Sequence, residues 1–328
     1  DSMKKIFTML IALALALSFG LSAGAEPKTA VTFAEVGWDS IRFHNAVAGT
    51  IAETVFGYTW EELSGSTPIT SEALMSGDID VHMEMWTDNL ATYKDDIAQG
   101  RMQELSVNFD DNAQGLYVPR YVIEGDSARG IDAVAPDLKT VEDLKKYASL
   151  FPDPESHGMG RIFGGLPGWQ VTTILEKKVQ HYGLDQMYNY VLPGSDAAMS
   201  AAFVSAWDKG VPIVAYYWEP TWLLGMYDCV LLEDAPYNAD TYMEGETAFP
   251  ATRVTICVSN EFMESNPEYC AFLSKYHTSS ALTSEALAHM QSTGDDYQAT
   301  ARWFLKQHGE LVDQWLTTEQ GAKLRATL

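Results

Sequence analysis

The stretch VPIVAYYWEPTW, residues 211–222, is the starting point for interpreting this chain. Its apolar and aromatic residues from Val211 to Tyr217 predict a strand that is covered on both faces. Pro220 cannot donate a ladder hydrogen bond, so the strand should end before it and leave Trp218 in a turn. Ligands of open α/β sheets bind at the carboxyl ends of the strands. The stretch therefore predicts a ligand site at Trp218.

Three other tryptophans lie at the ends of segments whose patterns also predict strands. Trp38 and Trp169 follow residues 31–36 and 160–165, and Trp86 is the last of residues 78–86. In residues 78–86 apolar and polar residues alternate, which predicts a strand with one buried face. A single tryptophan in a turn is more often a packing residue than a ligand contact. Four at equivalent positions favour a shared site. By contrast, three tryptophans within helical patterns predict core packing: Trp207, Trp303 and Trp315.

Converging indole rings suit one kind of ligand. A trimethylammonium group has no N–H donor, so proteins bind it with the electron-rich faces of aromatic rings. Each desolvated cation–π contact contributes about 2 kcal/mol, and a micromolar ligand needs about 8 kcal/mol. Three rings and one polar anchor are therefore enough. The four tryptophans predict a site for a small organic cation.

Two kinds of polar group lie near the four turns, namely carboxylates and free backbone N–H groups. Four carboxylates lie there: Asp39, Glu84, Asp88 and Glu219. They either give the cavity a negative potential or are solvated turn and cap residues, and the sequence leaves both interpretations open. The turn at residues 167–169 precedes a predicted helix, residues 170–182. The free N–H groups of Gln170 and Val171 at its start could bind a carboxylate.

Strands and helices alternate along the chain, which predicts an α/β fold with mostly parallel sheets. Residues 115–123 predict a strand interrupted by Pro119, and the charged segment after it predicts a crossover between domains. Residues 252–258 predict the return strand, after which the chain is mostly helical. A short helix with a capping box is expected at residues 140–147.

The first 25 residues predict a cleaved secretory signal peptide. Lys4 and Lys5 precede an apolar run, residues 6–21, and Ala23-Gly24-Ala25 supplies small residues for cleavage. The alternative is a membrane anchor, but the run is shorter than the roughly 20 residues that span a bilayer. No cysteine for a lipid anchor follows the run. We therefore expect a periplasmic protein. The length of the chain after residue 25 predicts two domains of roughly 150 residues each.

The composition and the absence of certain motifs argue against several classes of function. The formal net charge of -24 argues against nucleic acid and anionic lipid as partners, and mildly favours cationic ones, although solubility explains it equally well. The 3 cysteines allow at most one disulfide and show no metal-binding spacing. No nucleophile elbow, zinc-protease motif or phosphate loop occurs. We expect neither enzymatic activity nor a cofactor or metal.

Five segments together resemble one known family: GDIDVHMEMWTDN (77–89), LPGWQ (166–170), YYWEPTW (216–222), FPATRVTICVSN (249–260) and ARWFLKQHGELVDQW (301–315). The whole chain after residue 25 is similar to the substrate-binding proteins of ABC importers for glycine betaine and related quaternary amines. The resemblance implies two α/β lobes joined by two crossing strands, with the ligand in the cleft between them. Lobe I would comprise residues 26–117 and 254–328, and lobe II residues 118–253.

The resemblance also implies roles for particular residues. In the betaine-binding branch the tryptophans that match Trp86, Trp169 and Trp218 surround trimethylammonium, and backbone N–H groups matching Gln170 and Val171 hold the carboxylate. The choline-binding branch adds a tryptophan in a turn like that of Trp38, and a tyrosine for which Tyr117 is the candidate. Leu90 stands where the betaine branch has a carboxylate-binding histidine.

The sequence therefore predicts a monomeric receptor that delivers a quaternary amine to a membrane permease. Glycine betaine is the first candidate, followed by choline, carnitine and proline betaine, and the sequence does not decide among them. One alternative is a receptor for another cationic or zwitterionic amino acid, in which Asp39 or Glu219 contacts the ammonium group. The other is a secreted enzyme that acts on a small cationic substrate.

Overall fold

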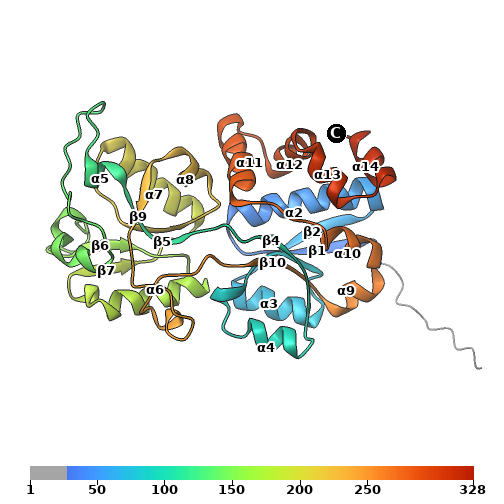
Figure 1. Ribbon diagram of the computed structural model, residues 1–328, viewed down its shortest axis with the longest axis horizontal. Coiled ribbons are helices and arrows are strands. Elements are labelled where there is room, and N and C mark those ends of the chain that lie inside the picture. The colour runs from blue at the N-terminus through green and yellow to red at the C-terminus, as the bar shows by residue number, and fades with distance from the viewer. Residues whose placement is uncertain (1–27) are drawn as a thin grey trace, which may run out of the picture.

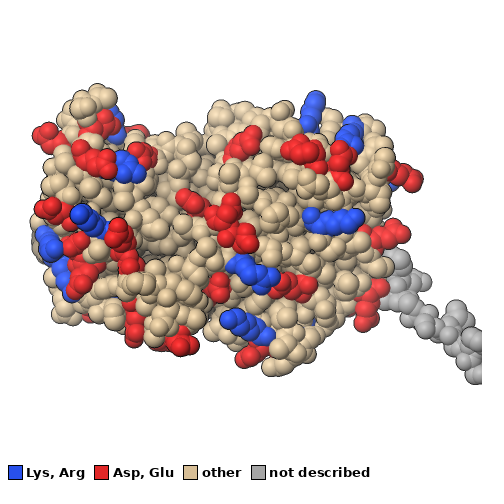
Figure 2. All heavy atoms as spheres, viewed as in Figure 1, with Lys and Arg blue, Asp and Glu red and all other residues tan. Residues whose placement is uncertain are grey.

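The computed structural model describes residues 28–328, so the predicted signal peptide lies outside the described part. Figure 1 shows two lobes side by side, each with a sheet between helices. Acidic and basic side chains lie intermixed over both lobes on the face shown in Figure 2. Within the described residues, no helix is both long enough and apolar enough to cross a membrane.

The first lobe contains a five-stranded sheet. In order across the sheet, its strands are β2 (Thr59–Ser64), β1 (Ala30–Glu35), β3 (Val81–Trp86), β10 (Val254–Val258) and β4 (Gln103–Phe109). Strand β1 pairs in parallel with β2 and β3, whereas β10 is antiparallel to both of its neighbours. Four strands therefore point one way, and their carboxyl ends share one edge of the sheet.

The second lobe repeats this plan with another five-stranded sheet. Its strands are, in order, β7 (Tyr188–Val191), β6 (Gly160–Phe163), β8 (Ala215–Trp218), β5 (Gln114–Pro119) and β9 (Cys229–Leu231). Strands β7, β6 and β8 are parallel, and β5 is antiparallel to both β8 and β9. Both sheets are thus mostly parallel, as the sequence predicts.

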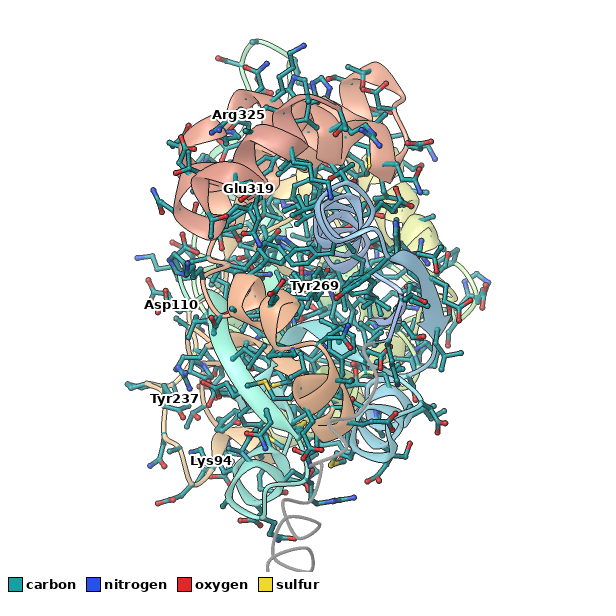
Figure 3. All side chains as sticks on the ribbon, turned by 90° about the vertical axis from the view of Figure 1, so that its right-hand side faces the viewer. Lys94, Asp110, Tyr237, Tyr269, Glu319 and Arg325 are labelled. Carbon is teal, nitrogen blue, oxygen red and sulfur yellow. The ribbon has the colours of Figure 1, made fainter. Side chains whose placement is uncertain are left out.

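Helices cover both faces of each sheet (Figure 1). Around the first sheet they are α2 (Asp39–Ile51), α3 (Thr67–Ser76), α4 (Tyr93–Ala98), α9 (Asn260–Ser265), α10 (Pro267–Leu273), α11 (Ser280–Thr293), α12 (Tyr297–Gln307), α13 (Gly309–Trp315) and α14 (Thr318–Arg325). Around the second they are α5 (Arg120–Glu124), α6 (Gln170–His181), α7 (Asp196–Lys209) and α8 (Trp222–Met226). Tyr269 of α10 lies in the interior of the first lobe, where its hydroxyl donates to the Ala48 carbonyl at 2.8 Å (Figure 3).

Two segments connect the lobes. The chain passes from β4 to β5 and returns from β9 to β10, and β5 and β10 are the antiparallel strands of their sheets. The two segments are held together where Asn112 Nδ2 donates to the Thr252 carbonyl at 2.6 Å and Asn112 Oδ1 accepts from Thr252 N–H at 3.0 Å. The lobe boundaries given above, residues 117 and 253, stay a prediction.

Two predicted strands differ from the observed ones. The strand predicted from Val211 is limited to β8, because the Val211 N–H donates to the Ala206 carbonyl and completes the end of α7, and Pro212 has no N–H to donate. The strand predicted at 115–123 ends at Pro119, where α5 begins. Sequence reasoning also missed four strands: β2, β4, β7 and β9.

Strand β3 corrects another expectation, because all six of its residues are buried rather than one face only. The strand lies in the middle of the sheet with helices on both sides, so its polar side chains are also enclosed.

Two smaller features agree with the sequence-based expectations, namely a capping box and the cysteines. The Thr140–Asp143 capping contacts form in both directions, although the segment after them is a 3₁₀ helix, Glu142–Lys146. All three cysteines are free.

Candidate functional site

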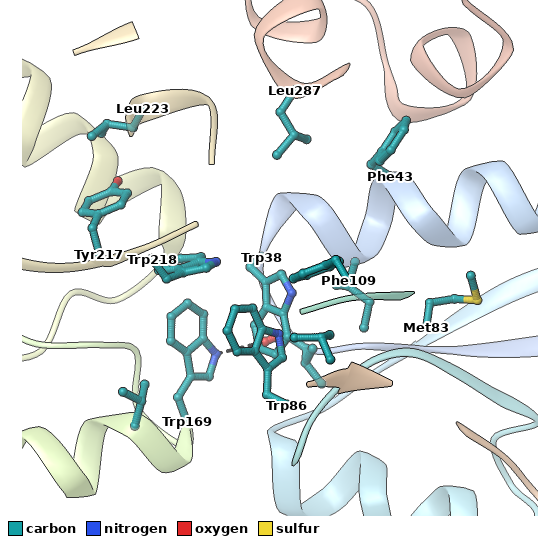
Figure 4. Close-up of a cluster of buried hydrophobic side chains, with 14 of the residues drawn as sticks. Trp38, Phe43, Met83, Trp86, Phe109, Trp169, Tyr217, Trp218, Leu223 and Leu287 are labelled. Carbon is teal, nitrogen blue, oxygen red and sulfur yellow. Dashed lines mark hydrogen bonds between the residues drawn. The ribbon is translucent and has the colours of Figure 1, made fainter. Parts of the chain in front are cut away.

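The four turn tryptophans come together between the two lobes (Figure 4). Trp38 precedes the first residue of α2, and Trp86 is the last residue of β3, so both come from the first lobe. Trp169 precedes α6 and Trp218 ends β8, so both come from the second. Parallel strands bring their carboxyl ends to one edge, and here two such edges face each other. We call these four residues the tryptophan box.

Two pairs of rings in the box stand nearly perpendicular to each other. The centroids of Trp38 and Trp169 are 5.2 Å apart with an interplanar angle of 86°, and those of Trp169 and Trp218 are 5.1 Å apart at 87°. Edge-to-face contacts of this kind are favourable for aromatic pairs. All four side chains are buried. Trp38, Trp169 and Trp218 therefore pack against one another at the lobe interface.

Trp169 and its neighbour Gly168 also form contacts between the two lobes. Trp169 Nε1 donates to the Val36 carbonyl of the first lobe at 3.0 Å (dashed in Figure 4). Beside it, Gly168 has a φ of 86°, and a methyl group there would lie 2.7 Å from Cβ of Ser66. Only glycine combines that backbone conformation with so close an approach. The box is thus seen in a closed arrangement.

A buried carboxylate lies against the first-lobe rings. Glu84 Oε2 accepts hydrogen bonds from Trp38 Nε1 at 2.6 Å and from Trp86 Nε1 at 3.3 Å. The Ser40 hydroxyl donates to the same oxygen at 3.1 Å. Burial, partly opposed by these hydrogen bonds, raises the pKa of Glu84 to about 7. Near neutral pH this carboxyl group therefore exists in both protonation states.

Polar groups occupy another part of the lining. Asn89 Nδ2 donates to Gln114 Oε1 at 3.3 Å, and the Tyr216 hydroxyl donates to the same oxygen at 3.0 Å. Oδ1 of Asn89 is buried and has no hydrogen-bond partner among the described residues. Gln170 and Val171, in the first turn of α6, also line the space, and first-turn N–H groups have no partner within a helix. The cavity therefore offers both an acceptor and donors.

The lining contains six of the nine residues predicted for the site, namely the four tryptophans, Gln170 and Val171. It also contains residues that were not predicted as ligand contacts: Thr67, Glu84, Met85, Asn89 and Tyr216. Glu84 and Tyr216 each lie two residues before a box tryptophan, on the same face of its strand, which was a usable signal. The cavity volume is about 40 Å³.

Three predicted residues lie outside the lining. Asp39 begins α2, and its carboxylate accepts from the Tyr297 hydroxyl at 2.5 Å. Tyr117 lies in the middle of the second sheet, where β5 pairs with β8 and β9. Glu219 lies close enough to Tyr117 to contribute, after burial, to raising the pKa of that tyrosine. The described residues include no cluster of side chains that could hold a metal ion.

Known proteins resemble this chain over most of its length. Residues 29–307 match the family described as the substrate-binding domain of ABC-type glycine betaine transport systems. The glycine betaine-binding periplasmic protein OusX of Dickeya dadantii is 22% identical over 232 residues, which is 64% of this chain and 68% of that protein. The glycine betaine/proline betaine-binding periplasmic protein of Escherichia coli K12 is 24% identical over 204 residues, 57% of this chain and 61% of that protein.

Two solved structures share the fold. An ABC-transporter choline-binding protein in complex with choline has a TM-score of 0.71 and 22% identity, over 91% of this chain and 98% of that one. A lactococcal protein in a closed, liganded conformation with glycine betaine has a TM-score of 0.68 and 19% identity, over 88% and 99%. The two-lobed architecture and the family match agree. The chain belongs to the family of substrate-binding domains of ABC-type glycine betaine transport systems.

Proposed function

We propose that this protein binds a quaternary ammonium compound inside the tryptophan box and delivers it to the permease of an ABC importer. One observation carries the proposal: four indole rings from two lobes enclose one small cavity, whose only charged lining residue is Glu84. Aromatic faces and a carboxylate both attract a cation, and neither requires the cation to donate a hydrogen bond. A quaternary ammonium group is a cation without an N–H donor, so it suits this lining.

The polar residues of the lining suit the part of the ligand that lies beyond its ammonium group. The first-turn N–H groups of Gln170 and Val171 suit the carboxylate of glycine betaine, because a helix N-terminus attracts anions. Oδ1 of Asn89 suits the hydroxyl of choline, because it is a buried acceptor without a donor. Glycine betaine remains the first candidate, followed by choline, carnitine and proline betaine.

The transport role rests on the family. Its members are the substrate-binding components of ABC-type transport systems, and the two curated relatives are named as periplasmic proteins. We infer that this protein acts as a monomer in the periplasm and passes its ligand to a membrane permease without changing it chemically. The two-lobed fold supports this role, because lobes joined by two segments can close by a hinge.

The position of two carboxylates argues against a receptor for an ordinary amino acid. Such a receptor would place Asp39 or Glu219 against a primary ammonium group, yet both lie outside the lining. A primary ammonium group has three donors that need acceptors, and the indole faces that make up much of the lining provide none. An enzymatic role has no comparable observation in its favour.

Matched ligands test the proposed function directly. Glycine betaine and glycine differ only in N-methylation, and so do choline and ethanolamine. Titration of the protein without its first 25 residues, followed by calorimetry or tryptophan fluorescence, should show micromolar binding of a methylated compound and none of its primary amine. If no trimethylammonium compound binds below millimolar concentration, or if the primary amine binds more tightly, the proposal is wrong.

A further inference from the structure

Glu84 combines features that packing alone does not explain. Its side chain is fully buried, and one oxygen, Oε2, accepts from the indole N–H groups of both first-lobe rings, Trp38 and Trp86. The other oxygen, Oε1, accepts no hydrogen bond from the described residues. A buried carboxylate normally uses both of its oxygens. Glu84 therefore holds two walls of the box and keeps one acceptor free.

No cationic side chain among the described residues balances this carboxylate. His44 of α2 approaches closest, with Nε2 3.6 Å from Oε1, but burial lowers the pKa of His44 to about 3, so its ring is neutral. His82 lies two residues earlier on the same strand, and burial lowers its pKa to about 3 as well. The Tyr276 hydroxyl contacts His44 Nδ1 at 2.8 Å, and burial raises the pKa of Tyr276 well above its usual value. All three groups that face Glu84 are therefore uncharged at neutral pH.

We propose that Glu84 positions the rings of Trp38 and Trp86 through their N–H groups and serves as the counter-ion of the quaternary ammonium group in the box. A buried charge is expensive unless it is paired. Glu84 is among the residues that line the cavity, so a cation bound there would lie beside this carboxylate. The inference rests on the proposed function and adds to it a residue that senses the charge of the ligand.

The pairing couples ligand binding to a proton. A cation in the box favours the ionised carboxylate, so it lowers the pKa of Glu84 below the value of about 7 that burial sets in the free protein. Binding should therefore release protons near pH 7. Because the ionised form binds better, affinity should rise with pH, by up to about tenfold between pH 6 and pH 8 if only the ionised form binds.

Calorimetry with glycine betaine and with choline tests the coupling, since neither compound titrates between pH 6 and pH 8. Titrations at pH 7 in two buffers that differ in ionisation enthalpy should give different apparent binding enthalpies for the parent protein, which reports proton release. Glu84→Gln removes the charge but keeps an acceptor oxygen. It should abolish both the buffer difference and the pH dependence, and it should weaken binding at pH 8 by about tenfold or more.

A separate measurement tests whether Glu84 positions the two indole rings. Near-UV circular dichroism reports the fixed environment of tryptophan side chains. Glu84→Gln should leave this spectrum close to that of the parent protein, because one oxygen still accepts from the indoles. Glu84→Leu removes both acceptors and should change the spectrum, while far-UV circular dichroism shows that the variant remains folded. An unchanged near-UV spectrum in folded Glu84→Leu would overturn the positioning role.

Asp196 of α7 provides the control for the pH dependence. Burial, followed by the nearby charge of Asp39, raises the pKa of Asp196 to about 7 as well. Asp196→Asn should retain the pH dependence of binding if Glu84 is its source. Loss of that dependence in Asp196→Asn together with its retention in Glu84→Gln would overturn the counter-ion role. The proposed function would survive that result, because it is tested separately by whether the parent protein binds a quaternary amine in preference to the matching primary amine.

Discussion

The two halves of the tryptophan box are held in place differently. In the first lobe, Trp38 and Trp86 both donate to Glu84, a residue of the same lobe, so their positions do not depend on the other lobe. In the second lobe, Trp169 donates across the interface to the Val36 carbonyl, and its ring contacts Trp38. One half is therefore preformed, and the other is completed when the lobes meet. We therefore expect the ligand to bind first to the first lobe, after which the second lobe closes on it.

Trp169→Ala should have the largest effect on affinity. It removes one aromatic face, worth about 2 kcal/mol for a desolvated cation, and one interlobe hydrogen bond, worth about 1 kcal/mol. The combined loss of about 3 kcal/mol corresponds to roughly a hundredfold weaker binding. Calorimetry with the best quaternary amine measures this loss. A smaller loss than that of Trp218→Ala would contradict the closing role assigned to Trp169.

Trp218→Ala should weaken binding by about 2 kcal/mol, or roughly thirtyfold, because it removes a face but no hydrogen bond across the interface. Trp218→Phe should lose less, since a weaker face remains. The matched control is Trp315→Ala in the C-terminal helices, where the ring is fully buried. That change should destabilise the fold by about 3–5 kcal/mol and leave the affinity of the folded protein unchanged. If Trp218→Ala lost only stability, Trp218 would be a packing residue.

Gly168→Ala tests closure without touching a ring. The added methyl would lie 2.7 Å from Cβ of Ser66 on the opposite lobe, so the lobes could not meet in their present arrangement. Overpacking of this kind costs about 1–3 kcal/mol, which predicts binding weaker by about tenfold. Gly158→Ala is the control, because Gly158 has a similar φ of 84° but no atom within 4 Å of the added methyl. Equal affinities of the two variants would show that the close approach does not limit closure.

Trp303→Ala should have the smallest effect. The sequence predicts Trp303 as a core residue, but its ring is only partly buried and stacks on His289 at a centroid distance of 3.8 Å. We expect a loss of about 1–2 kcal/mol in the free energy of unfolding, less than for Trp315→Ala, and no change in affinity. Thermal unfolding of the two variants side by side measures the difference. An equal loss of stability would mean that partial exposure does not lower the cost of removing the ring.

Local sequence patterns were sufficient for the positions of the four box tryptophans. Each follows a predicted strand, and a strand end is a local property that depends on apolar runs, prolines and glycines. The parallel arrangement of the sheets then brings such ends to one edge. The same reasoning identified the first turn of α6, because the turn before it precedes a helical pattern. Local signals therefore identified six residues that line the cavity.

Local patterns misled where burial depends on distant segments. The alternation in β3 indicated a polar, exposed face, yet Glu84 on that face is buried, because helices cover both sides of the sheet. Tyr117 is the tyrosine that the resemblance offered for the site, but of Tyr117 and Tyr216 only Tyr216 lines the cavity. The choice depends on which face of a strand meets the cavity, and pairing with strands far away in sequence determines that.

The sequence by itself determined that four indole rings lie at strand ends and that the fold is a two-lobed α/β architecture. The strand ends and the α/β class follow from the order and periodicity of apolar residues, whereas the two lobes are what the resemblance to the family implies. Only the tertiary structure decided that Glu84 pairs with two of the rings and that a third ring bonds across to the other lobe. Two of these contacts, Trp38 to Glu84 and Trp169 to Val36, join residues 46 and 133 positions apart. Hydrogen bonds and burial at such separations depend on how whole sheets pack, and no local pattern encodes that packing.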